Sequence, residues 1–130
     1  MEAKTYNGWT NYETWAVALW LDNEEPSYRL TRDLTQTVWR EAPQSQAVRE
    51  WGWSRVEAAE HRLAELLREF IEGHNPTPPT TLFADLMWAA LGEVNWQELA
   101  SHYLADIAEE HEKETTEKDN EQHMEEKQTK

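Results

Sequence analysis

Apolar residues recur every three or four positions along most of this chain, a spacing typical of amphipathic helices. One such face carries Tyr12, Trp15 and Leu19. No stretch alternates between apolar and polar residues with a period of two, as a half-buried strand would. The sequence therefore predicts an all-α fold, a compact orthogonal bundle of four or five helices.

Capping and breaking residues set the expected bounds of these helices. Thr10 and Glu13 have capping-box spacing at the start of the first helix, and Asn95 precedes the last in the same way. Gly73 is expected to end the third helix as its C′ residue. The expected helices cover residues 10–21, 26–40, 54–72, 81–91 and 95–107, with a short or irregular helix at 46–53.

The end of the chain differs from the rest, because the apolar periodicity stops at Ala108. Residues 109–130 hold nine acids and four lysines, which leaves 17 acids and eight bases for residues 1–108. A charged segment of this composition lacks the apolar surface that a packed core requires. We therefore expect a helical domain over 1–108 and an acidic, largely disordered tail over 109–130.

The chain is strongly acidic, with a formal net charge of −14. Such a charge repels nucleic acid and favours a basic protein partner, so no direct nucleic-acid binding is expected. The alternative is that the acidity serves solubility alone. The N-terminal residues lack the pattern of a signal peptide and no apolar run is long enough to span a membrane, so a cytoplasmic location is expected.

Recognisable catalytic or ligand-binding patterns are missing from the sequence. There is no cysteine, and the five histidines show no metal-binding spacing. No glycine-rich phosphate loop or nucleophile motif occurs. We therefore expect a binding protein without metal or cofactor, not an enzyme.

Eight tryptophans make up the most distinctive part of the composition. The first helix contains Trp15 and Trp20, so it is expected to be the central, most buried element, and Trp96 is expected to pack in the core. Trp51 and Trp53 lie in a less periodic segment around a glycine. They are either interface residues or residues of a small packing cluster beside the main core, and the sequence leaves both interpretations open. The predicted protein-binding residues are these two tryptophans and four acids of the same region, Glu57, Glu60, Glu65 and Glu69. The alternative interpretation of the four acids is that they belong to a solvated, salt-bridged helix face.

Two blocks of the sequence stand out as motifs. The first is YNGWTNYETW, which continues as AVALWLDN, and the second is FADLMWAALGEVNW. Both resemble a family of small proteins found in bacteriophages, plasmids and other mobile elements. We interpret the motif residues as structural, with a turn, a helix cap and core aromatics. They are Asn7, Gly8, Trp9, Thr10, Tyr12, Glu13, Trp15, Trp20, Asp85 and Trp96.

The resemblance implies a mobile-element context and supplies no activity. Small acidic proteins of such elements often inhibit host defence by occupying basic grooves that bind DNA. The resulting hypothesis is an anti-CRISPR or anti-restriction inhibitor that binds a basic nucleic-acid-binding effector, with DNA mimicry as one mode. The alternative is a non-inhibitory adaptor or regulatory protein of the element.

Overall fold

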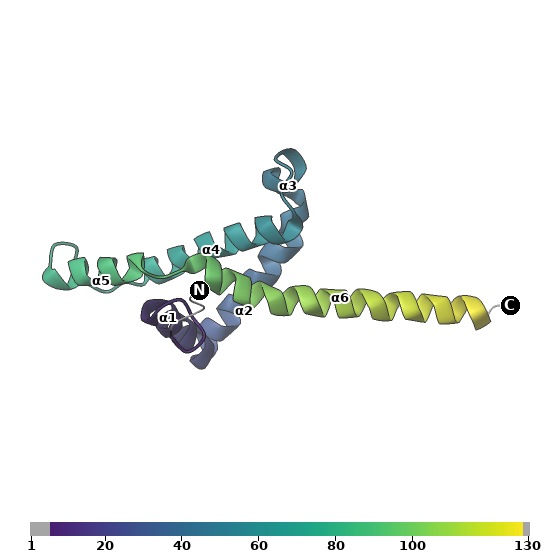
Figure 1. Cartoon of the computed structure of the whole chain (residues 1–130), viewed down its shortest axis with the longest axis horizontal. Helices are drawn as coiled ribbons and strands as arrows, with labels where there is room; N and C mark the ends of the chain where they lie inside the picture. Colours follow the sequence, from purple (N-terminus) through teal and green to yellow (C-terminus); the bar gives the residue numbers. More distant parts are fainter. Residues whose placement is uncertain (1–5, 129–130) are drawn as a thin grey trace.

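The computed structural model describes residues 6–128, and Figure 1 shows that they form an assembly of helices. Within this range the sole β-type contact is an isolated bridge between Tyr6 and Trp9. The predicted all-α bundle is confirmed, and the segment expected to be short or irregular contains a five-residue helix. The elements are α1 (Tyr12–Asn23), α2 (Glu25–Glu41), the 3-10 turn η1 (Ala42–Gln44), α3 (Gln46–Glu50), α4 (Arg55–Gly73), α5 (Leu82–Gly92) and α6 (Trp96–Gln128).

Helix α4 is the centre of the bundle. It packs against both α2 and α6, and its Leu63 and Leu67 are 0% exposed, as is Leu99 of α6. Its polar residues face solvent, which is the arrangement that its amphipathic sequence predicts. The fully buried core consists mainly of alanine and leucine, with tryptophans only partly buried against it.

The prediction that the first helix is the central element is wrong. Helix α1 buries Thr14, Ala18 and Leu21, while Trp20 is 63% exposed. Trp15 is half-buried. A helix that is apolar on most sides does not reveal from sequence which side meets the bundle, and here the narrow side with small residues does so.

Two of the expected helix ends also differ. The N-cap of α1 is Asn11, whose side-chain oxygen accepts from the Thr14 N–H, so the expected Thr10–Glu13 capping box does not form. Gly73 is the last residue of α4 rather than its C′ residue, and its φ is not positive. The following residue, His74, lies with Nδ1 2.8 Å from the Phe70 carbonyl oxygen.

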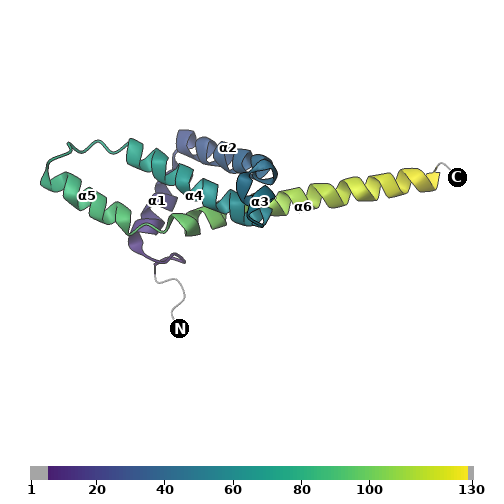
Figure 2. The ribbon, with the colours of Figure 1, turned by 90° about the horizontal axis from the view of Figure 1, so that it is seen from above.

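Helices α5 and α6 return along α4 in the opposite direction, as both ribbon views show (Figures 1 and 2). Figure 2 shows α5 standing apart from α4 at one end of the molecule. At the other end, the second half of α6 projects beyond the bundle. This projecting part begins where the sequence loses its apolar periodicity. Its backbone is helical as far as Gln128, and its largely disordered state stays a prediction.

Candidate functional site

The first motif begins with a tight turn, as its Asn-Gly pair predicts. Asn7 has a φ of 45° and Gly8 a φ of 90°, the left-handed pair of a type I′ turn. The backbones of Tyr6 and Trp9 exchange two hydrogen bonds across it, of 2.9 and 2.7 Å. The turn folds the Tyr6 ring against Trp15, with centroids 5.0 Å apart.

The structure joins the first motif directly to the second. The Asn11 side chain donates to the Glu93 carbonyl at 2.6 Å, and Thr14 Oγ1 accepts from the Asn95 N–H at 2.9 Å. Thr10 N–H donates to Glu98 Oε1 at 3.2 Å. These contacts fix the start of α1 to the loop between α5 and α6. The geometry gives both motifs a structural role at this junction.

The remaining motif residues divide between packing and surface positions. Trp9 and Trp96 are half-buried against the core, as expected of packing residues. Tyr12 is exposed, and Glu13 lies in the first turn of α1. Asp85 is exposed in the first turn of α5, where a negative charge favours the helix N-terminus.

Trp51 and Trp53 lie beside an open hollow of about 650 Å³, bounded by the end of α2, by η1 and α3, and by one side of α4. Trp51 is 60% exposed, whereas Trp53 is half-buried and packs against the core. The two rings meet edge to face, with centroids 6.0 Å apart. The apolar part of the lining includes Val38, Ala42, Ala47, Ala58 and Leu66.

The backbone around Gly52 fixes both tryptophans at the hollow. Gly52 has a φ of 77°, a conformation that favours glycine. It allows the N–H groups of Trp51 and Trp53 to donate to the same carbonyl, that of Ala47, at 3.2 and 3.0 Å. The glycine between the two tryptophans is thus the local reason that both side chains line one site.

The hollow has charged groups in its lining, and only some of them were among the predicted protein-binding residues. Glu65 lines it, as does Glu41 from the end of α2, together with His61 and Arg62. The contribution of Glu41 was not predicted, because it depends on how α2 packs against α4. The sequence offered no local signal for it.

The other predicted glutamates are engaged elsewhere or stand alone. Glu57 completes the capping box of α4 with Ser54, and Glu60 accepts from Gln97 Nε2 at 2.7 Å. Glu65 lies 3.8 Å from Arg62 Nη1. Glu69 makes no hydrogen bond or ion pair with the described residues. The four side chains therefore do not form one continuous row of free carboxylates.

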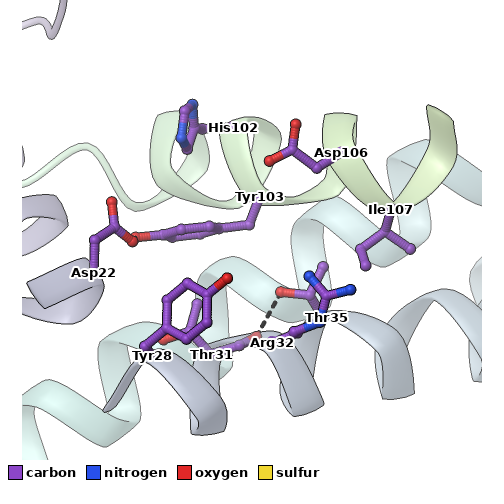
Figure 3. A pocket seen from close by; sticks show the side chains of 9 residues that line it. All are labelled: Asp22, Tyr28, Thr31, Arg32, Thr35, His102, Tyr103, Asp106 and Ile107. Atoms are coloured by element: carbon purple, nitrogen blue, oxygen red, sulfur yellow. Dashed lines mark hydrogen bonds between the residues drawn. The ribbon is translucent and has the colours of Figure 1, made fainter. Parts of the chain in front are cut away.

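A second, smaller hollow between α2 and α6 is shown in Figure 3. There the Tyr103 hydroxyl donates to Asp22 Oδ1 at 3.0 Å. Burial, the charge of Asp22 and this hydrogen bond raise the pKa of the Tyr103 phenol above its ordinary value. The phenol therefore stays protonated and links α6 to α1. The volume of about 190 Å³ is below that of usual small-molecule sites.

Within the described residues, no cluster of three or more histidine and carboxylate side chains could hold a metal ion. Among the same residues, no helix has both the length and the apolar character needed to span a bilayer.

A family model matches residues 2–100, which is most of the chain. The protein belongs to the family of unknown function DUF7249. The DUF7249 region contains both motifs and the Trp51 hollow, and it ends within the packed part of α6. No curated protein and no solved structure matches the chain.

Proposed function

We propose that this DUF7249 protein binds a basic protein through the hollow beside Trp51. The observation that carries this proposal is an exposed tryptophan at an open, mainly apolar hollow with Glu41 and Glu65 at its edge. Tryptophan is enriched among the residues that dominate binding energy, and the net charge of −14 favours a basic partner.

The mode of contact we propose is insertion of a partner side chain into this hollow. An arginine or lysine has an apolar stem for the tryptophans and a charged end for Glu41. Glu65 lies 3.8 Å from Arg62, so a partner cation would share it with that residue. Imitation of a row of DNA phosphates is the weaker mode, because on α4 Glu65 and Glu72 are paired with Arg62 and Arg68.

For the biological role, we propose inhibition of a host defence system by occupation of a basic nucleic-acid-binding effector, a CRISPR–Cas or restriction component. The acidic charge and the resemblance to mobile-element proteins support this role. The test is phage growth on cells that carry such a system, with and without this protein. Restored growth that requires Trp51 supports the proposal, and unchanged restriction across several systems contradicts it.

Trp51→Ala is the variant that tests the site, and Trp20→Ala is its matched control. Both side chains are exposed, at 60% and 63%, and Trp20 lies on α1, an element that does not line the hollow. We expect Trp51→Ala to abolish the restored phage growth and Trp20→Ala to retain it. Equal loss in both variants contradicts a specific role for the hollow.

The second candidate is an adaptor or regulatory protein of the element whose acidity serves solubility. The charge at the hollow distinguishes it from an inhibitor. A protein with Glu41→Gln and Glu65→Gln should lose inhibition if the charge contacts a basic effector. Under the adaptor proposal the same changes leave function intact. Glu57 is left unchanged in this test, because it caps α4.

A further inference from the structure

Helix α5 presents an apolar stripe to solvent. Leu82 and Phe83 are each 67% exposed, Leu86 is 59% exposed and Met87 is 36% exposed. At 3.6 residues per turn these four side chains and Ala90 lie within an arc of about 140°. An amphipathic helix normally turns such a stripe toward the core of its own domain. Here the stripe is left without a partner in the described part of the chain.

The helix is held in place by other residues. Ala84 and Leu91 are its buried positions, and Thr81 caps its start by accepting from the Ala84 N–H at 3.1 Å. Its far end is fixed where Glu93 and Asn95 bond to α1. The bundle thus holds α5 at its far end, while its start is capped locally, and the stripe (Leu82, Phe83, Leu86, Met87 and Ala90) faces outward.

The exposed area is comparable to that of the largest apolar patch on an ordinary monomer. With about 200 Å² for a large side chain, the exposed fractions of the four large stripe residues amount to roughly 450 Å². Contiguous apolar patches of about 300–600 Å² are the largest on ordinary monomers and are often functional. A surface of this size therefore indicates a binding face.

The charges near α5 indicate which kind of partner can bind this face. All Lys and Arg residues lie outside residues 5–28 and 69–112, the two segments that contain α1 and α5. Asp85 and Glu93 lie on or next to α5, and neither has a basic neighbour within its segment. Arg68 of α4 lines a hollow together with Glu93, but it is paired with Glu72 at 3.0 Å. The charges that belong to the α1 and α5 segments themselves are therefore acidic alone.

We propose that the α5 stripe binds a cationic amphipathic helix of another protein. The apolar side of such a helix packs on the stripe, and its Lys or Arg residues face Asp85 and Glu93. An anionic membrane surface is repelled by the same charges. A second copy would bring like charges together. It would bury roughly 900 Å² in total, below the size of a usual specific interface.

The test uses the full-length protein and a labelled synthetic peptide of about 18 residues, in which leucine and lysine are placed to form an amphipathic helix of about five turns. A second peptide carries glutamate in place of each lysine. Fluorescence anisotropy measures the affinity of each. We expect the lysine peptide to bind, with an affinity that falls as salt is added, and the glutamate peptide not to bind.

Variants locate the binding face. Phe83→Gln combined with Leu86→Gln should weaken peptide binding by about tenfold or more, as expected when two central apolar side chains are removed. Leu86→Ala, which keeps a good helix former, should weaken it less but in the same direction. Val56→Gln is the matched control, because Val56 is an exposed apolar residue of α4. Equal binding by the double variant and the control overturns the proposal.

Further measurements exclude the other occupants and separate this proposal from the Trp51 hollow. Sedimentation that shows a dimer, lost in the double variant, assigns the stripe to a second copy and overturns the proposal. Recruitment to vesicles of anionic phospholipid overturns it in favour of a membrane. Trp51→Ala should leave peptide binding unchanged, so that failure of the hollow and failure of the stripe are distinguishable. Loss of peptide binding in Trp51→Ala contradicts the assignment to α5.

Discussion

At the residue scale, the Thr14 hydroxyl connects two distant parts of the chain. The side chain is 0% exposed, donates to Asn11 Oδ1 at 2.6 Å and accepts from the Asn95 N–H. One hydroxyl therefore serves both the cap of α1 and the loop before α6. The sequence motif contains Thr14, but the spacing of Thr10 and Glu13 favours Thr10 as the capping residue. No local pattern reveals the second role of Thr14, because its partner Asn95 lies 81 positions away.

Thr14→Val should destabilise the protein by about 1–3 kcal/mol. Valine has a similar shape, but it leaves the Asn95 N–H and the Asn11 side chain without this partner. The free energy of unfolding in urea measures the effect. Thr80→Val is the control at an exposed position and should change stability by less than about 0.5 kcal/mol. Equal stability of both variants would show that water replaces the Thr14 hydroxyl without loss.

Tyr103 gives a prediction about pH. Its pKa is raised in the folded state by burial and by Asp22, so the folded protein holds the phenol proton more tightly than the unfolded chain. The stabilising contribution is complete below the ordinary tyrosine pKa of about 10 and is lost as the pH rises above it. Unfolding free energies of the native protein should therefore fall more steeply above about pH 10 than those of Tyr103→Phe.

At neutral pH the same Tyr103→Phe variant should lose about 0.5–1.5 kcal/mol, the usual contribution of one hydrogen bond. The parallel measurement on Tyr28→Phe is the control, because Tyr28 lines the same hollow and is exposed. Identical pH profiles for the native protein and Tyr103→Phe would contradict the raised pKa.

At the element scale, the positions of the helices in the sequence are predictable, but which helix lies at the centre of the bundle is not. The periodicity located all five long helices, since local spacing of apolar residues determines the face that each helix offers. The buried face of α4 is predictable, because its charged side chains leave only one face for the core. Helices α1 and α5 are apolar around most of their circumference, so their sequences do not say which side is buried. That choice depends on packing between elements distant in sequence.

The residues of the candidate site were likewise predictable only where the signal is local in the sequence. Trp51 and Trp53 were identified from the glycine between them, a local signal. Glu41 was missed, because the end of α2 reaches the hollow only through packing against η1 and α4. The exposed stripe of α5 had a signal in its sequence, an 11-residue helix with a single charged residue, but exposure itself depends on the fold.

The central position of α4 predicts unequal effects of equal substitutions. Leu63→Ala should destabilise the bundle by about 2–5 kcal/mol, because Leu63 is fully buried and its removal leaves a cavity. Leu82→Ala on α5 should change stability by less than about 0.5 kcal/mol. Thermal and urea unfolding of both variants provide the comparison. A large loss in Leu82→Ala would mean that α5 is packed more closely than the structure shows.

At the scale of the whole molecule, the described contacts between α6 and the other helices end near residue 111. Among the described side chains, Glu110 and His111 are the last of α6 to reach another helix. Glu110 lies 3.5 Å from Arg32 Nη2, and the His111 ring is 5.7 Å from that of Trp39. The family match ends still earlier, at residue 100.

A chain that stops after Lys113 should therefore fold as the full chain does. We expect its free energy of unfolding to lie within about 0.5 kcal/mol of the full-length value, because only residues beyond these contacts are removed. Circular dichroism during urea unfolding measures this. A chain that stops after Ala100 is the contrasting control, because it lacks the buried Leu104 and Ile107 and should not fold stably. A large loss in the longer version would assign these last residues a stabilising role.

The junction between the two motifs also has a consequence in time. Its three hydrogen bonds join residues 81, 82 and 88 positions apart, so each closes a loop that spans most of the chain. Closing such loops slows folding, because the ordering precedes the contacts that reward it. On the ribosome, α1 is followed at once by α2, against which it packs, yet the hydrogen-bond partners of its first residues emerge only after α5 has been synthesised. The beginning of this protein is therefore among the last parts of the nascent chain to reach its final contacts.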